Sequence, residues 1–272
     1  MEELKKDEYV VKPCTTCAGE NRIIDISRII KKLDFLCDKK DFDEAERLIN
    51  YWLKEASSNN DKRTELELQN EYIGFLRKQN RKDDAIIHSK RCIEIIDELN
   101  LGNTISGATV MLNVATVYKA FGEPDIAMTY FRKAESVYSD SLKKDDKLLA
   151  GLYNNMALAL VDLGQFDAAE KLYLSAISIM LKYDQGELDA AISYLNMADL
   201  FYKKYSVDPS GDYTVYGNVI DESCKKAWEL LNKKTLNRDS YYRFVAEKCA
   251  GTFGYYGYFL YESELKKRAN DV

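Results

Sequence analysis

The residues whose type and spacing could do chemistry in this sequence are three asparagines. Asn113, Asn155 and Asn196 lie in the segments LNVA, NNMA and LNMA, separated by 42 and 41 residues. A carboxamide carries two donors and an acceptor on one short arm, so it can pair with the N–H and C=O groups of an extended peptide whatever the peptide's side chains are. The same amides could instead bridge adjacent helices and touch no ligand, and both interpretations stay open at the level of sequence.

Groups that could support catalysis or metal binding are few. We expect the single histidine, His88, to be a helix residue rather than a general base, and no Gly-rich phosphate loop, G-x-S-x-G or H-E-x-x-H motif is present. Cys14 and Cys17 form one C-x-x-C pair, but a structural zinc site needs four ligands and there is no second pair. We therefore expect no catalytic residue, no metal and no cofactor, and two incidental thiols in an N-terminal arm. The sequence predicts a non-enzymatic protein.

The composition narrows the class of partner. The chain has 272 residues and a net charge of −6, which argues against nucleic acid as its main partner. No stretch approaches the ~20 apolar residues of a membrane span, and the first residues lack an apolar signal region. We expect a cytoplasmic protein with no membrane and no nucleic-acid partner. Only 3 prolines and 13 glycines occur, which favours long helices.

An internal repeat supplies the elements that must position the asparagines. The segments FDEAE, KDDAI, PDIAM and FDAAE each place Asp two residues before Ala, and these alanines are 40, 42 and 42 residues apart. Two further registers keep nearly the same spacing, so three registers agree along most of the chain and predict a repeat architecture. The three registers consist of Ala45, Ala85, Ala127 and Ala169; Trp52, Cys92, Ala134, Ala176 and Ala227; and Ile73, Ala115, Ala157 and Ala198.

Each repeat unit is predicted to be a pair of antiparallel helices. Residues 149–163 place apolar side chains at i, i+3, i+4 and i+7, which is the pattern of a helix with one buried face. A turn such as Gly164-Gln165 follows, and the recurrent Asp fits the N-cap or first turn of the second helix. Pro124 suits the first helical position. One pair cannot bury both of its apolar faces, so neighbouring pairs must stack.

The segments GQFDAAEKLYLSAISIMLK (164–182) and FGEPDIAMTYFRKAESVY (121–138) resemble the tetratricopeptide-repeat (TPR) family. The spacing is similar to the 42-residue variant of kinesin light chains and of bacterial peptide-sensing regulators. The resemblance implies an all-α, right-handed superhelical solenoid of five TPR hairpins and a C-terminal capping hairpin. We expect an arm at 1–22 and a solenoid at 23–272, with repeats at about 24–57, 62–100, 105–142, 147–183 and 188–233, an insertion at 206–217 and a cap at 239–270.

The resemblance also implies a function. In the TPR arrangement the first helices line a concave groove, and in the peptide-binding members asparagines at the matching position pair with a peptide backbone. Asn113, Asn155 and Asn196 are expected to do the same, whereas unit two carries Glu71 at that position and Asn154 is assigned no role. The sequence thus predicts a protein- or peptide-binding adaptor. The expected groove residues are Asn113, Asn155, Asn196, Thr116, Leu158, Asp199, Tyr202, Lys203, Lys119, Arg77 and Lys78, with Asp162 beside them.

A second function is open on the same sequence. The protein could be a scaffold or self-associating adaptor, a homo-oligomer that uses its outer face or its tyrosine-rich C-terminal end, with the asparagines purely structural. Tyr213 and Tyr216 in the insertion are candidate exposed anchors. Only about twenty residues precede the first repeat, too few for the helix-turn-helix domain of the peptide-sensing regulators, so we expect no direct action on DNA.

Overall fold

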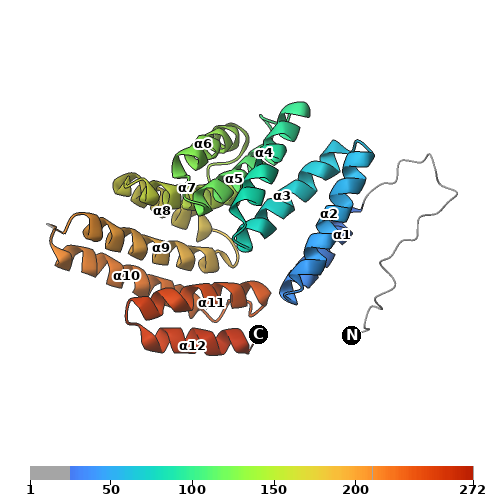
Figure 1. The fold of residues 1–272 in the computed structure, drawn as a ribbon. Helices are drawn as coiled ribbons and strands as arrows, with labels where there is room; N and C mark the ends of the chain where they lie inside the picture. Colours follow the sequence, from blue (N-terminus) through green and yellow to red (C-terminus); the bar gives the residue numbers. More distant parts are fainter. Residues whose placement is uncertain (1–24, 210, 272) are drawn as a thin grey trace. The chain divides into compact units, whose positions relative to one another are not determined.

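The structure is a computed structural model that describes residues 25–209 and 211–271 (Figure 1). The predicted arm at 1–22, with Cys14 and Cys17, lies outside the described residues. Every regular element of the described part is a helix, as the repeat pattern predicted. Within that part, no helix has the length and apolar character needed to cross a membrane.

Twelve helices form consecutive pairs along the described chain. They are α1 (Ile26–Asp38) and α2 (Phe42–Ser58); α3 (Lys62–Lys78) and α4 (Lys82–Glu98); α5 (Ile105–Ala120) and α6 (Pro124–Ser141); α7 (Lys147–Asp162) and α8 (Phe166–Met180); α9 (Gly186–Val207) and α10 (Tyr213–Leu231); and α11 (Ser240–Tyr255) and α12 (Phe259–Asn270).

The chain divides into two compact units, and the division falls inside α3, between Leu68 and Gln69. In the first unit, α1 packs against α2, and the buried side chains include Leu33 on α1 and Ile49 on α2. The second unit contains the remainder of α3 and the helices α4 to α12.

The second unit is a helical-repeat solenoid. The two helices of each pair from α5 onwards contact each other, and each of α4, α6 and α8 contacts the first helix of the next pair. The first helices α5, α7, α9 and α11 also contact their neighbours in that order. The pairs α5–α6, α7–α8 and α9–α10 are therefore each packed between two neighbours, as stacking requires.

The small residues of the repeat registers lie where helices cross. Ala115, Ala157 and Ala198 on the first helices are fully buried or nearly so, and so are Ala127 and Ala169 on the second helices. An alanine at a crossing lets two helix backbones approach closely, because it fills no more space than a methyl group. The spacing in the sequence therefore reflects one contact repeated from unit to unit.

The recurrent aspartate occupies the first turn of each second helix rather than the N-cap. Asp43, Asp83, Asp125 and Asp167 each stand second in α2, α4, α6 and α8. Their carboxylates lie at the positive end of the helix dipole, which is the first-turn alternative that the sequence left open. Pro124 stands at the first position of α6, as predicted.

The turn inside each of the first four pairs contains one residue with a left-handed backbone. These residues are Lys40, Asn80, Gly122 and Gly164, with φ values of 58°, 57°, 79° and 71°. The spacing matches that of the alanine register, so the turn is part of the repeat. Glycine and asparagine accept this conformation readily, whereas a lysine is strained in it.

The extra length of the fifth pair is mostly helical. α9 has 22 residues where α5 and α7 have 16. The segment 206–217, expected as an insertion, contributes its first two residues to the end of α9, and Tyr213 already begins α10. The C-terminal part of α9 carries Tyr202, whose ring contacts Tyr255 and Tyr256 of the last pair, and Tyr205, whose ring contacts Tyr213 and Tyr216 of α10.

Candidate protein-binding face

The first-helix face is the name we give to the side chains of α5, α7 and α9 that the sequence placed in the groove. The three helices contact in that order, so equivalent positions follow one another across the face. The face is made up of Asn113, Thr116 and Lys119 on α5; Asn155, Leu158 and Asp162 on α7; and Asn196, Asp199, Tyr202 and Lys203 on α9.

The three asparagines are all half-buried, and each uses its amide nitrogen in a hydrogen bond within the protein. Asn113 Nδ2 donates to Asn70 Oδ1 of α3 at 2.8 Å, and Asn196 Nδ2 donates to Asn154 Oδ1 of α7 at 3.2 Å. Asn155 Nδ2 instead donates to the carbonyl of Gly151, one turn earlier in its own helix, at 2.9 Å. Two of the three amides therefore connect adjacent first helices.

Asn154, which the sequence analysis left without a role, is a partner in this network. Its Oδ1 accepts the Asn196 bond and a second bond from Ser193 Oγ at 2.9 Å. Asn70, on α3 of the second repeat and one residue before Glu71, plays the same part for Asn113 that Asn154 plays for Asn196. The signal missed in the sequence was a second pair of amides. Asn70 stands 43 residues before Asn113, and Asn154 stands 42 residues before Asn196, whereas the other equivalent positions carry leucine.

A row of charges runs across the C-terminal ends of the same three helices. Asp162 Oδ1 lies 3.1 Å from Lys203 Nζ, and its Oδ2 lies 3.5 Å from Lys119 Nζ. One carboxylate on α7 therefore pairs with lysines on both neighbouring first helices. The three groups were predicted to share the groove, and the structure brings them together.

The remaining predicted residues occupy varied environments. Thr116 Oγ1 donates to the Leu112 carbonyl of its own helix at 2.9 Å, and Leu158 is half-buried on α7. Arg77 and Lys78 end α3; burial lowers the pKa of Arg77, and Lys78 is exposed. Neither of these two side chains makes a hydrogen bond or ion pair with the first-helix face in the described residues.

Tyrosines attach the last helix pair to the fifth. Tyr256, just after α11, donates from its hydroxyl to Asp199 Oδ1 of α9 at 2.8 Å, and Tyr258 donates to Asp221 Oδ1 of α10 at 2.8 Å. Burial raises the pKa of both tyrosines above the ordinary value, and the adjacent carboxylate raises it further. The sequence pointed to a tyrosine-rich end, but only the fold pairs these hydroxyl groups with aspartates.

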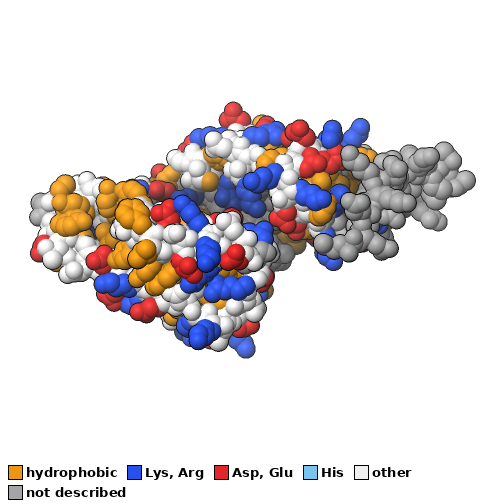
Figure 2. Space-filling view, turned by 90° about the horizontal axis from the view of Figure 1, so that it is seen from below, with side chains coloured by type: hydrophobic (Ala, Val, Ile, Leu, Met, Phe, Trp, Pro, Cys, Tyr) orange, Lys and Arg blue, Asp and Glu red, His pale blue; other side chains and the backbone are white. Residues whose placement is uncertain are grey.

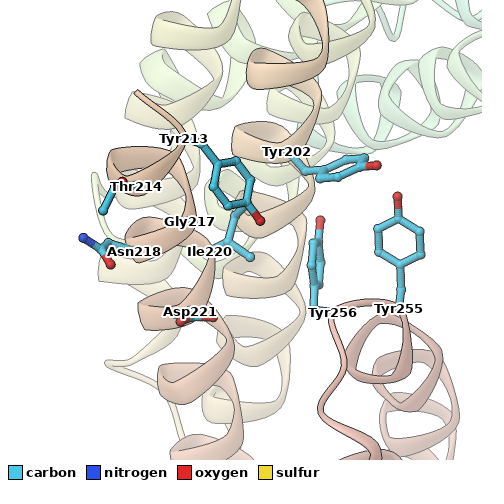
Figure 3. Close-up of a pocket in the computed structure, with 9 residues that line it drawn as sticks. All are labelled: Tyr202, Tyr213, Thr214, Gly217, Asn218, Ile220, Asp221, Tyr255 and Tyr256. Atoms are coloured by element: carbon cyan, nitrogen blue, oxygen red, sulfur yellow. The ribbon is translucent and has the colours of Figure 1, made fainter. Parts of the chain in front are cut away.

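A pocket of about 710 Å³ lies where α9, α10 and the end of α11 meet (Figure 3). Its volume is within the range of small-molecule and side-chain sites. Tyr202, predicted as a groove residue, and Tyr213, predicted as an exposed anchor, both line the pocket. Tyr216, the other predicted anchor, packs beside Phe201 and Tyr205. The lining residues are Tyr202, Tyr213, Thr214, Gly217, Asn218, Ile220, Asp221, Tyr255 and Tyr256.

His88 and the cysteines have structural surroundings. His88 Nδ1 lies 2.6 Å from Gln69 Oε1, and its ring packs 4.6 Å from that of Tyr72. Burial raises the pKa of the Cys224 and Cys249 thiols to about 12, which makes them poor nucleophiles. In the part of the chain that the structure describes, no three His, Cys, Asp or Glu side chains converge in a way that could hold a metal ion.

Comparison with known proteins identifies the fold of these helix pairs. Residues 149–182, which span α7 and α8, match the family model of the tetratricopeptide repeat. The chain has a TPR-like repeat fold. Such repeats generally mediate protein interactions and are typically non-enzymatic scaffolds.

Two solved structures illustrate the similarity. BtubC (BKLC) from P. vanneervenii is 18% identical, with a TM-score of 0.64 over 79% of this chain and 84% of that chain. A Podosopora anserina kinesin light chain structure with nearly identical TPR-like repeats is 13% identical, with a TM-score of 0.53 over 76% of this chain and 93% of that chain. No curated protein sequence matches the chain. At these identities the similarity is one of fold.

Proposed function

We propose that this TPR-like protein is a non-enzymatic binding module that holds an extended peptide segment of a partner protein against the first-helix face. The observation that carries the proposal is the state of the three amides. Asn113, Asn155 and Asn196 are each oriented by a bond through Nδ2, and in the described residues Oδ1 of none of them accepts a hydrogen bond. Each therefore keeps one acceptor and one N–H for a ligand.

The spacing of the amides suits an extended chain. Neighbouring packed helices lie about 10 Å apart, and a strand advances about 3.3 Å per residue. An extended peptide that crosses α5, α7 and α9 would therefore meet an amide at about every third residue. A peptide of roughly seven residues spans all three, and its backbone supplies both the N–H and the C=O groups that the amides need.

The surroundings of the amides support the same ligand class. The Lys119–Asp162–Lys203 row carries two cations for one carboxylate, so that end of the face favours a peptide that presents an acidic group. Leu158 lies between the amides and the row and is half-buried, which offers an apolar contact for one peptide side chain. Backbone pairing would thus supply affinity, and side chains would supply specificity.

The test uses a photoreactive benzoylphenylalanine at position 158, in the full chain in its native cells. We expect cross-links to one partner protein, reduced at least about tenfold when Asn113, Asn155 and Asn196 are all alanine, because each amide contributes about 1 kcal/mol. The same group at Leu174, an exposed residue of α8, is the matched control and should give no partner cross-link. Unchanged cross-linking by a triple variant with wild-type helicity would refute the proposal.

A second candidate function is self-association through the C-terminal end. Hydrophobic side chains gather over the α9–α10 and α11–α12 turns (Figure 2), and Phe259 and Leu260 are 68% and 84% exposed. Exposed apolar residues grouped in this way are typical of interaction surfaces. Sedimentation across a wide concentration range tests this function, and a strict monomer at every concentration would count against it.

We propose the cytoplasm as the compartment in which this binding takes place. Cys224 and Cys249 are buried as thiols, which is the ordinary use of cysteine in a reducing compartment. The proposed partner is a protein, and no step of the proposal involves a cofactor, nucleic acid or membrane.

A further inference from the structure

We propose that the tyrosine pocket between α9, α10 and α11 is a second binding site, specific for an arginine side chain of a partner protein. The site is distinct from the asparagines of the first-helix face, because the pocket is lined from α10 and the end of α11 as well as from α9. It therefore goes beyond the peptide-binding function proposed above.

Four tyrosine rings line the pocket, those of Tyr202, Tyr213, Tyr255 and Tyr256. Figure 3 shows Tyr213 of α10 with Ile220 close to it on one side and Tyr256 on the other, with Tyr202 and Tyr255 next to Tyr256. The Tyr202 and Tyr255 rings meet at 89° with centroids 5.4 Å apart, and those of Tyr255 and Tyr256 at 84° and 5.1 Å. These edge-to-face contacts hold the three rings as one rigid wall.

These rings are open to solvent rather than part of the core. Tyr202, Tyr213 and Tyr255 are 42%, 60% and 62% exposed. Aromatic rings held rigidly at a pocket and left exposed are poised to bind, because little side-chain freedom is lost when a ligand contacts them. The negative face of an aromatic ring attracts a cation placed over it.

The charges at the pocket are negative. Asp221 lines it, and its Oδ1 accepts a hydrogen bond from Tyr258, which holds the carboxylate and leaves Oδ2 for a second donor. Asp199 accepts a hydrogen bond from the Tyr256 hydroxyl. Among the residues that the structure describes, no lysine or arginine lines the pocket. The lysines next to Tyr202 on α9 pair elsewhere, Lys203 with Asp162 and Lys204 with Asp167.

Arginine fits this combination better than lysine. A guanidinium is planar and weakly hydrated, so it stacks on a tyrosine face while its N–H groups reach a carboxylate at the edge. An ammonium group is a compact, strongly hydrated charge that gains less from stacking. The pocket provides the faces of Tyr213 and Tyr256 and the carboxylate of Asp221, which is the pair of features that a guanidinium uses.

The experiment follows the Ile220 side-chain methyl signal by NMR in the full chain while Nα-acetyl-arginine methylamide is added. We expect a saturable shift, with at least about fivefold weaker binding of the citrulline analogue, which has the same shape but no charge. The lysine analogue should also bind more weakly than arginine. Equal binding of citrulline, tighter binding of lysine, or no saturable shift would overturn the proposal.

Variants assign the binding to named groups. Tyr213→Leu removes an exposed ring face and Asp221→Asn removes the charge, and each should weaken arginine binding at least about fivefold. Tyr213→Phe is the matched control, because it keeps the ring and should bind within about twofold of wild type. Wild-type affinity in both Tyr213→Leu and Asp221→Asn would refute the site. The variant with alanine at Asn113, Asn155 and Asn196 should bind arginine with wild-type affinity. The arginine site and the peptide-binding face are therefore tested separately, and one proposal can fail without the other.

Discussion

The amide bridge between α7 and α9 can be tested by replacing Asn154 with alanine. Asn154 Oδ1 accepts from Ser193 Oγ at 2.9 Å and from Asn196 Nδ2 at 3.2 Å. Ser193 has other acceptors within reach, the Asp189 carbonyl at 3.1 Å and Met180 Sδ at 3.4 Å, so its hydroxyl keeps a partner. The loss therefore falls mainly on Asn196. A net hydrogen bond contributes about 0.5–1.5 kcal/mol, so we expect the lost bridge to cost about 1 kcal/mol.

Asn155→Ala is the matched control for this substitution. Asn155 is the adjacent residue of the same helix, and its amide bonds only to the Gly151 carbonyl one turn earlier. Both substitutions gain the same helix propensity, about 0.5 kcal/mol, so this contribution cancels in the comparison. We expect the Asn154→Ala protein to have a free energy of unfolding about 1 kcal/mol lower than that of the Asn155→Ala protein.

A double-mutant cycle with Asn196→Ala isolates the pair. Urea unfolding followed by circular dichroism should give a coupling energy of about 0.5–1 kcal/mol between positions 154 and 196, with unchanged m values. A coupling below about 0.3 kcal/mol, within the additivity of independent sites, would refute the bridge. Unfolding of the Asn154→Ala and Asn155→Ala proteins at the same urea concentration would also refute the bridge.

Two further predictions concern the turns and the C-terminal pair. Lys40→Gly should raise the free energy of unfolding in urea by about 0.5–1 kcal/mol, because glycine relieves the left-handed backbone at 58°, whereas Lys39→Gly, at a φ of −77°, should lower it. Tyr241, Tyr256 and Tyr258 have folded pKa values raised above 10.0, first by burial. The stability that these raised pKa values provide is fully present below pH 10 and is lost as the pH rises above it. The free energy of unfolding should therefore decrease above pH 10, and it should decrease less steeply in Tyr256→Phe. An equal slope in that variant would contradict this origin of the decrease.

The sequence was a good guide to the helices because their pattern is local. An apolar side chain every three or four residues marks the face of a helix, and a small residue every 40 to 42 marks the point where helices cross. Ala115, Ala157 and Ala198 were placed correctly at this level. Trp52, in the same position as the buried Cys92, is only half-buried, because the register specifies a position and not how completely it is covered.

The candidate site was only partly accessible from the sequence. The pairing of Asp162 with Lys203 followed from their equal places in two successive first helices, whereas Lys119 is one residue before the equivalent position on α5. The role of Asn154 did not follow, because it is the neighbour of the asparagine that matched the repeat, and its equivalents on α5 and α9 are leucines. The pocket at Tyr255 was also missed, because most of the residues that line it come from the start of α10 and the end of α11, where no repeat register was found.

By itself the sequence determined the repeat, the helices and the buried alanines. These features depend on contacts between residues close in the chain and on one packing contact copied from unit to unit. The tertiary structure alone decided which amide pairs with which and how the tyrosines of α11 meet α9 and α10. The physical reason is that a hydrogen bond or a ring contact depends on the relative rotation of two helices to within an ångström, and no spacing in one sequence specifies that rotation.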